Sequence, residues 1–257
     1  MKNNRVFVRD LLEEVYRLLG SNLPRESYAF KGGYILMKEF GAEVRKTMDI
    51  DLSISGIDVY YDIIRIISPL LEDYKLKEEL SKYKVKEPIE NNLKNISGGI
   101  KIYRLGNFNG VQRSFKVTDI DISIHSVKKG ITVNADGFSQ YTFERMLADK
   151  ICVMYSNTDT ILRRIRDVYD IFCIYRRIYR SVDRGLVLDL LIDRGVNISQ
   201  KSVFENVIEH DPERILKALK DMLEDDTRVD KAYGKKVDIG GVIETVLVCI
   251  NYFRSYA

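Results

Sequence analysis

The sequence predicts an α+β protein, in which a mixed β-sheet with flanking helices is followed by an all-helical C-terminal part. Three observations predict this class. The first half of the chain alternates helical and period-two stretches, its turns contain paired glycines, and the periodic stretches after Tyr141 are all helical. The chain has 257 residues, enough for one large domain or two small ones. We expect an α/β domain over residues 1–140 and a helical domain over residues 141–257.

The N-terminal elements follow from periodicity and turn residues. Residues 8–20, VRDLLEEVYRLLG, have helical periodicity that ends at Gly20, and KGGYILMKEFG predicts a Gly-Gly turn that opens a short helix. TMDIDLSIS alternates with period two, which predicts a strand ending before Gly56. An amphipathic pattern over residues 56–74 predicts the next helix.

The middle of the chain predicts strands and the rest predicts helices. From Leu93 to Phe138, apolar alternation is broken by Gly98–Gly99, GNFNG and KKG, which indicates strands joined by hairpins. After that, helical patterns occupy residues 143–155, 161–180, 186–193, 212–224 and 240–257.

Composition narrows the class of protein. The formal net charge is only +3, so bulk charge does not indicate nucleic-acid binding and only local clusters can. Three cysteines without a CxxC motif argue against a disulfide framework. The start of the chain lacks a signal-peptide core, and the most apolar late stretch is shorter than a membrane span. We therefore expect a cytoplasmic protein without a membrane partner.

Two acidic stretches carry the strongest functional signal. In DIDLSIS, a strand places Asp49 and Asp51 on one face and the apolar residues on the other, and DIDISIH repeats this pattern with Asp119 and Asp121. Paired carboxylates can converge on a hard divalent cation such as Mg²⁺, and a third carboxylate allows a two-metal site for phosphoryl transfer. The alternative is an edge strand whose acidic face is merely solvated.

Two other features fit a phosphate ligand. The Gly32–Gly33 turn before a helix exposes backbone N–H groups that suit a triphosphate. Lys150 falls inside the apolar stripe of its helix, where it either covers apolar surface with its stem or points at a phosphate.

The helical pattern over residues 161–180 leaves two interpretations open. Its apolar stripe includes Phe172, Tyr175 and Tyr179, and we expect that face in the core. The same stretch holds six arginines and two aspartates, which indicates either a solvated helix with i,i+4 ion pairs, such as Arg163 with Asp167, or a helix that holds polyphosphate or RNA.

In order along the chain stand KGG at 31–33, RKTMDIDLSI at 45–54, an acidic strand at 119–121, ADK at 148–150 and RIRDVYDI at 164–171. This set resembles the AbiEii/AbiGii toxin family of nucleotidyltransferases, within the DNA polymerase β-like superfamily. The resemblance implies a nucleotidyltransferase-type sheet domain and a helical domain that completes the active-site cleft.

The resemblance also implies roles for residues. Asp49 and Asp51 would hold Mg²⁺ or Mn²⁺, with Asp121 as the third acid and Asp119 as its substitute. Lys150 would neutralise phosphate charge and Asp167 would be an active-site acid. The residues that would bind or support the nucleotide are Lys31, Gly32, Gly33, Arg45, Thr47 and Asp170.

The implied function is the transfer of a nucleoside monophosphate from an NTP to an RNA, such as a tRNA, or to a protein. Such an enzyme would be the toxin of a toxin–antitoxin or abortive-infection system with a separately encoded antitoxin. Two alternatives stay open: a non-catalytic module that binds nucleotide or RNA, and a metal-dependent phosphohydrolase on the same site.

Overall fold

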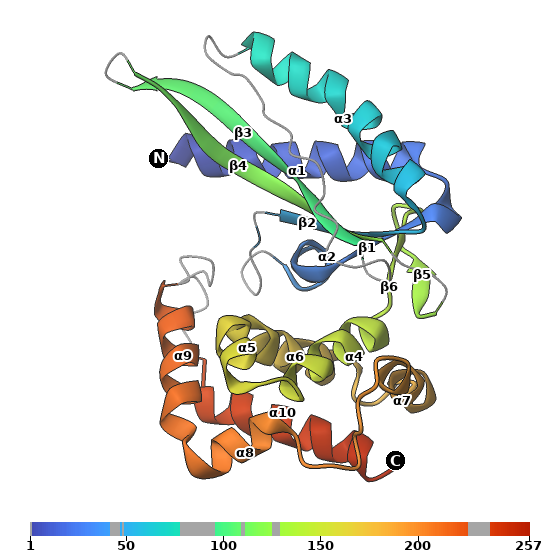
Figure 1. The fold of residues 1–257 in the computed structure, drawn as a ribbon, viewed down its shortest axis with the longest axis vertical. Coiled ribbons are helices and arrows are strands. Elements are labelled where there is room, and N and C mark those ends of the chain that lie inside the picture. Colours follow the sequence, from blue (N-terminus) through green and yellow to red (C-terminus); the bar gives the residue numbers. More distant parts are fainter. Residues whose placement is uncertain are drawn as a thin grey trace. The chain divides into compact units, whose positions relative to one another are not determined.

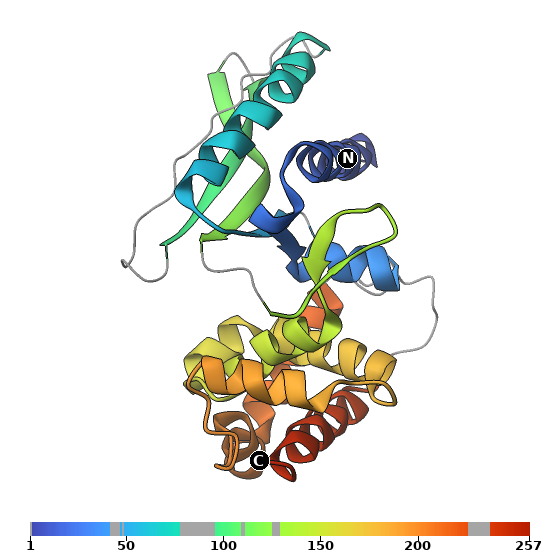
Figure 2. The same cartoon turned by 90° about the vertical axis from the view of Figure 1, so that its right-hand side faces the viewer.

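The computed structural model describes the backbone of residues 2–41, 47, 49–77, 96–108, 111–124, 129–225 and 237–257. Contacts divide the chain into two compact units, Met1–Gln140 and Tyr141–Ala257. The first unit contains a mixed sheet with helices, and the second is helical (Figures 1 and 2).

The first unit is built on a six-stranded sheet with the order β3-β4-β2-β1-β6-β5. The strands β2 and β4 run parallel, whereas β1 pairs antiparallel with β2 and β3 pairs antiparallel with β4. The bounds are β1 Tyr28–Lys31, β2 Asp49–Ile54, β3 Ile96–Phe108, β4 Val111–Ile124, β5 Ile131–Val133 and β6 Ser139–Tyr141.

The apolar face of this sheet is buried under two long helices. The helices α1 (Lys2–Asn22) and α3 (Ile57–Lys77) lie side by side (Figure 1). Ile50, Leu52 and Ile54 of β2 are completely buried, as the period-two pattern predicts. Tyr16 of α1 packs on Phe30 of β1, with ring centroids 4.5 Å apart.

A short helix follows β1 directly. After the 3₁₀ turn Arg25–Ser27 and β1, the helix α2 (Gly32–Phe40) begins at the predicted Gly-Gly turn and is capped by Gly41. It packs on β1 and β2. The position of Gly32–Gly33 is therefore fixed next to the acidic strand β2.

From Phe143 onward, the secondary-structure elements among the described residues are all helices. They are α4 Phe143–Met154, α5 Thr158–Arg163, α6 Ile165–Ile178, α7 Arg184–Asp193, α8 Val203–His210, α9 Pro212–Asp225 and α10 Ile239–Arg254. Among the described residues, no helix is long and apolar enough to cross a lipid bilayer.

One predicted helix is wrong in its extent. The stretch 161–180 divides at Arg164, whose backbone ends α5 and precedes α6 with φ −109° and ψ 30°. The N–H of Asp167 then donates to the carbonyl of Arg164 at 2.8 Å. The division places the Asp167 carboxylate in the first turn of a new helix, where the helix dipole favours a negative charge.

Candidate active site

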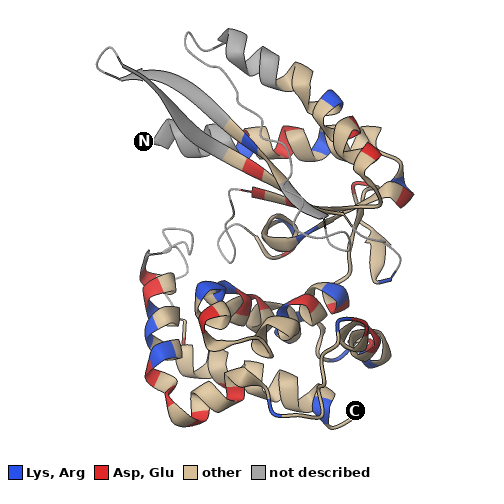
Figure 3. Ribbon diagram, in the orientation of Figure 1, with Lys and Arg blue, Asp and Glu red and all other residues tan. Residues whose placement is uncertain are grey.

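Each unit contains one group of charged residues that includes predicted site residues. The first group lies on β2 and β4, where acidic positions stand on neighbouring strands (Figure 3). The second group lies on α4 and α6.

The four aspartates of the sheet form two rows in register. Asp49 pairs with Asp119, and Asp51 pairs with Asp121, across parallel strands that are about 4.8 Å apart. Residues in register on neighbouring strands project from the same face, so all four carboxylates lie on the face opposite the buried isoleucines. The sheet therefore concentrates four like charges that the sequence separates by seventy residues.

The two rows differ at their ends. Continuing outward, Asp121 pairs with Gly99 of β3, and Asp51 pairs with Lys31 of β1. Asp119 pairs instead with Lys101. Asp121 is exposed, whereas Asp119 is buried. The Asp51–Asp121 row is therefore the more accessible of the two.

Gly99 leaves space beside Asp121. A Cβ atom at Gly99 would lie 3.2 Å from Oδ1 of Asp121, which is tighter than ordinary van der Waals contact. The absence of a side chain on β3 thus helps to accommodate the exposed carboxylate.

The Gly-Gly turn meets the same row. The N–H of Gly33 donates to Oδ2 of Asp51 at 3.3 Å, and Gly32 has φ +69°. A Cβ atom at Gly32 would lie 1.9 Å from Oδ2 of Asp51, so no side chain fits there without moving the carboxylate. The N-terminus of α2 and Asp51 therefore share one small space.

Further contacts hold the strand residues. The hydroxyl of Thr47, which is buried, donates to Oδ1 of Asp49. The ammonium of Lys31 donates to Oγ of Ser123 at 2.8 Å and so reaches from β1 across β2 to β4. Arg45 lies outside the described residues.

This arrangement fits a hard divalent cation. Carboxylate oxygens on adjacent strands are the donors that Mg²⁺ and Mn²⁺ prefer, and the missing side chain at Gly32 leaves room for the Asp51 carboxylate. Within the described residues, no three His, Cys, Asp or Glu side chains already converge as a metal-binding group. The in-register rows place the carboxylates side by side, while Asp49 and Asp51 point to Thr47 and Gly33.

In the helical unit, Lys150 binds two carboxylates at once. Its ammonium donates to Oδ1 of Asp167 at 2.8 Å and to Oδ2 of Asp170 at 2.6 Å. All three residues are buried, with 7% of Lys150 exposed, so the ion pairs are shielded from water. Arg164 approaches the other oxygen of Asp167 at 2.7 Å, in place of the expected pair with Arg163.

These contacts shift two pKa values. Burial alone would lower the pKa of Lys150, but the charges of Asp167 and Asp170 outweigh it and hold the pKa above its usual value. Burial would raise the pKa of Asp167, but Lys150 and Arg164 hold it below its usual value. Lys150 and Asp167 are therefore both ionised at neutral pH.

The structure shows contacts that the sequence pattern did not indicate. Lys101 beside Asp119 and the bond from Lys31 to Ser123 depend on the pairing register of three strands. The sequence signals for the buried cluster were the ADK and RIRDVYDI motifs and the position of Lys150 in an apolar stripe, and none of them indicated that these residues pair with one another. From the pattern, the ammonium of Lys150 could point at a phosphate or at solvent. In the structure it binds two aspartates instead.

Comparison with known proteins identifies the family. A family model described as nucleotidyl transferase AbiEii toxin, Type IV TA system, matches residues 15–236. No curated protein matches the sequence. Among solved structures, JHP933 from Helicobacter pylori is similar, with a TM-score of 0.53 and 14% identity over 95% of this chain and 90% of that chain. This likeness concerns the fold alone. The Megavirus polyadenylate synthase gives a TM-score of 0.42 and 9% identity over 100% of this chain and 50% of that chain.

Proposed function

The chain belongs to the family of AbiEii nucleotidyl transferase toxins, and from this premise we propose that it moves a nucleoside monophosphate from an NTP to an RNA or protein acceptor. Membership confirms the resemblance seen in the motifs and makes the chain a nucleotidyltransferase of the toxin class. A toxin of this family implies a cognate antitoxin, and we propose that it is separately encoded. Because its substrate is an NTP, we place the reaction in the cytoplasm.

One observation carries the proposed site: the Asp51–Asp121 row lies in register and ends at the Gly32–Gly33 turn. We assign Asp49 and Asp51 as ligands of Mg²⁺ or Mn²⁺, and Asp121 as the third acid. Asp121 is favoured over Asp119 because it is exposed, shares a row with Asp51 and has Gly99 beside it. Asp119, next to Lys101, is the substitute.

We propose that the N-terminus of α2 binds the triphosphate. The N–H of Gly33 and the positive end of the helix favour an anion, as the bound Asp51 carboxylate already illustrates. Lys31 adds a positive charge at the end of the same row. Thr47 fixes Asp49 by its hydrogen bond, and Arg45 is assigned to support of this loop.

We propose that the helical unit contributes Lys150, Asp167 and Asp170 and completes the active-site cleft. Lys150 is proposed to neutralise phosphate charge and Asp167 to act as an active-site acid. Their mutual ion pairs support this proposal, because they hold a buried ammonium ionised and in one orientation.

The reaction follows from these assignments. The oxygen of an acceptor hydroxyl attacks the α-phosphorus of the NTP, the bond from that phosphorus to the bridging oxygen breaks, and pyrophosphate leaves. Asp121 takes the proton of the hydroxyl, while Gly33 and Lys31 hold the phosphates. A bound divalent cation would lower the pKa of the hydroxyl and neutralise charge on the phosphate oxygens. Positioning and electrostatics account for most of the catalysis in such transfers.

Label transfer tests the proposal. The protein is incubated with Mg²⁺, each α-labelled NTP in turn, and total RNA or protein extract. We expect a labelled RNA or protein with wild type and none with Asp49→Ala or Asp51→Ala. Full activity with normal metal dependence in both variants would refute the assignment.

The same assay separates the two alternatives. A binding module would bind labelled NTP without transferring label to any acceptor. A phosphohydrolase would release phosphate or pyrophosphate while every acceptor stayed unlabelled.

A further inference from the structure

A run of exposed arginines crosses the end of α6 and the start of α7. Arg176, Arg177, Arg180 and Arg184 are all exposed, and only Asp183 adds a negative charge between them. The carboxylate of Asp183 is occupied by capping α7, where it accepts from the N–H of Leu186 at 3.0 Å. This stretch therefore carries a strong local positive charge in a chain whose net charge is small.

These arginines differ from others in the same unit. Arg164 pairs with Asp167, Arg194 with Asp149 and Arg254 with Glu205. Among the residues that the structure describes, none of the four arginines between 176 and 184 has a carboxylate at ion-pair distance. The interpretation of a solvated helix held by internal ion pairs thus fits the start of α6 but not its end.

Aromatic rings lie under the guanidinium groups instead. Arg176 stands over Phe172 at 5.1 Å, and Arg184 stands over Tyr256 at 4.2 Å. The Nε–H of Arg180 donates to the hydroxyl of Tyr179 at 2.5 Å. Such contacts hold a guanidinium flat while leaving its outer N–H groups open to a ligand.

The rings themselves reach the surface. Tyr179 is 47% exposed and Tyr256 is 57% exposed, so the expectation that the stripe ending at Tyr179 lies in the core is wrong at this end. Tyr252 of α10 connects the ring of Tyr175 on α6 with the ring of Tyr256, because it contacts both. At the end of α6, the aromatic residues Tyr252 and Tyr256 therefore continue the row of rings on the surface.

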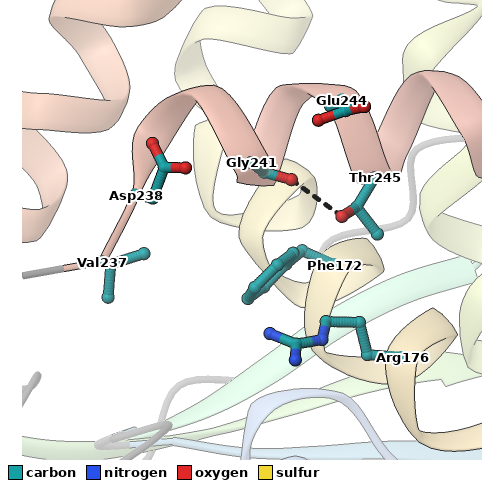
Figure 4. Close-up of a pocket in the computed structure, with 7 residues that line it drawn as sticks. All are labelled: Phe172, Arg176, Val237, Asp238, Gly241, Glu244 and Thr245. Carbon is teal, nitrogen blue, oxygen red and sulfur yellow. Dashed lines mark hydrogen bonds between the residues drawn. The ribbon is translucent and has the colours of Figure 1, made fainter. Parts of the chain in front are cut away.

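A cavity of about 430 Å³ lies next to Arg176. Figure 4 shows the ring of Phe172 and the guanidinium of Arg176 on one side, and Val237 and Asp238 at the start of α10 on the other. This volume lies in the range of small-molecule sites, and its walls combine an aromatic face and one cation with two carboxylates, those of Asp238 and Glu244. A nucleotide presents matching groups, namely a flat base, a phosphate, and amino or hydroxyl donors.

We propose that this arginine–tyrosine surface, formed by Phe172, Arg176, Tyr179, Arg180, Arg184 and Tyr256, binds a single-stranded segment of the acceptor RNA. Single strands are bound by guanidinium contacts to phosphates and by bases stacked on exposed aromatic rings. The cavity beside Phe172 takes one nucleotide, with its phosphate on Arg176 and its donors toward Asp238. The inference rests on the proposed function, because it selects RNA over protein as the acceptor.

Fluorescence anisotropy with an end-labelled single-stranded RNA of twelve nucleotides tests this surface in the full chain. The measurement uses neither NTP nor metal, at 50 and 200 mM KCl. We expect Arg176→Ala/Arg180→Ala to weaken binding at least tenfold at 50 mM. Because each lost phosphate contact on a single strand lowers the salt slope by about 0.7, the slope should fall by about 1.4.

Matched variants separate specific from general charge effects. Arg214→Ala/Lys217→Ala removes the same charge from exposed positions of α9 and should leave binding within twofold. Tyr256→Ala should weaken binding about tenfold through lost stacking, and Tyr256→Phe should restore it. Unchanged affinity and salt slope in Arg176→Ala/Arg180→Ala, or equal losses in both double variants, would overturn the proposal.

The failure of this surface is distinguishable from the failure of the proposed function. Asp51→Ala should bind RNA like wild type while it transfers no label. Label transfer to RNA that Arg176→Ala/Arg180→Ala leaves intact would keep the function and remove the surface. Label found only on protein, with no RNA binding by wild type, would also remove it.

Discussion

The chain holds its two groups of aspartates in opposite ways. On β2 and β4, four carboxylates stand in two rows, and their described contacts are to a hydroxyl and a backbone N–H. In the helical unit, Asp167 and Asp170 are bound by a buried ammonium. The second group binds its carboxylates to a buried ammonium, whereas the first places four carboxylates side by side on neighbouring strands.

This difference teaches that the same kind of side chain has a different effect on stability in each group. A buried ion pair loses stability when one partner is removed, because the other charge stays behind. A row of partly exposed like charges gains nothing in stability from its mutual repulsion. We therefore expect variants of the strand aspartates to lower activity with little effect on stability, and variants of the helical cluster to lower stability as well as activity.

The largest expected effect is on activity at the strand site. Asp51→Asn keeps the shape of the side chain and removes its charge, and we expect transferase activity to fall about 10³-fold, on the order of 4 kcal/mol. The free energy of unfolding should change little, since repulsion within the row is relieved while the amide keeps an oxygen that can accept from the N–H of Gly33. Label transfer and denaturant unfolding measure the two. The control, Asp58→Asn on the exposed start of α3, should change neither.

The next effect is on stability at the helical cluster. Lys150→Met leaves two buried carboxylates without their ammonium, and we expect a loss on the order of 3–5 kcal/mol in the free energy of unfolding. Denaturant unfolding followed by circular dichroism measures it. Lys150→Met/Asp167→Asn/Asp170→Asn should recover part of the loss. A Lys150→Met variant as stable as wild type would contradict the buried pairing.

A smaller effect is expected at the Gly32–Gly33 turn, which contacts Asp51 of the strand site. Gly32→Ala places a methyl group where Oδ2 of Asp51 lies, at a positive φ, and we expect Mn²⁺ binding to weaken at least tenfold. Electron paramagnetic resonance of added Mn²⁺ measures it without any substrate. Gly195→Ala has a similar φ of +71° with nothing within 4 Å, so it carries the backbone strain alone and should bind Mn²⁺ normally. If both variants bound Mn²⁺ equally well, Mn²⁺ binding would not depend on the missing side chain at Gly32.

The smallest effect is the pH dependence of the buried cluster. The pKa of Asp167 is lowered on folding, so its contribution to stability is present above about pH 3.9 and is lost as the pH falls through the folded pKa. The pKa of Lys150 is raised, so its contribution is present below about pH 10.4 and is lost as the pH rises through the folded pKa. Between about pH 5 and pH 9 the cluster should contribute a constant free energy.

Free energies of unfolding measured across this pH range test the direction of the pKa shift of Asp167. Below about pH 4, wild type should lose more stability than the triple variant Lys150→Met/Asp167→Asn/Asp170→Asn, which has no ionised cluster to protonate. A steeper acid loss in the triple variant would mean that Asp167 is not held ionised by its partners.

Local patterns were sufficient for much of this molecule. Period two in DIDLSIS determined that Ile50 and Ile54 face the core while Asp49 and Asp51 share the other face. The Gly-Gly turn determined the start of α2, because only glycine adopts the conformation of Gly32 without strain. Together with the later motifs, these patterns were enough to indicate the family that the family model confirms.

Tertiary structure decided what local patterns do not encode. Which acids share a row depends on the pairing of β2 with β4, and a shift of one residue would send Asp121 to the other face. The short strand β1 and the helix α8 were not predicted from the sequence. The partners of Lys150 were likewise decided by packing, because an ammonium buried away from water needs carboxylates in place of solvent. Sequence thus determined the chemistry of each face, and long-range pairing decided which of those groups meet.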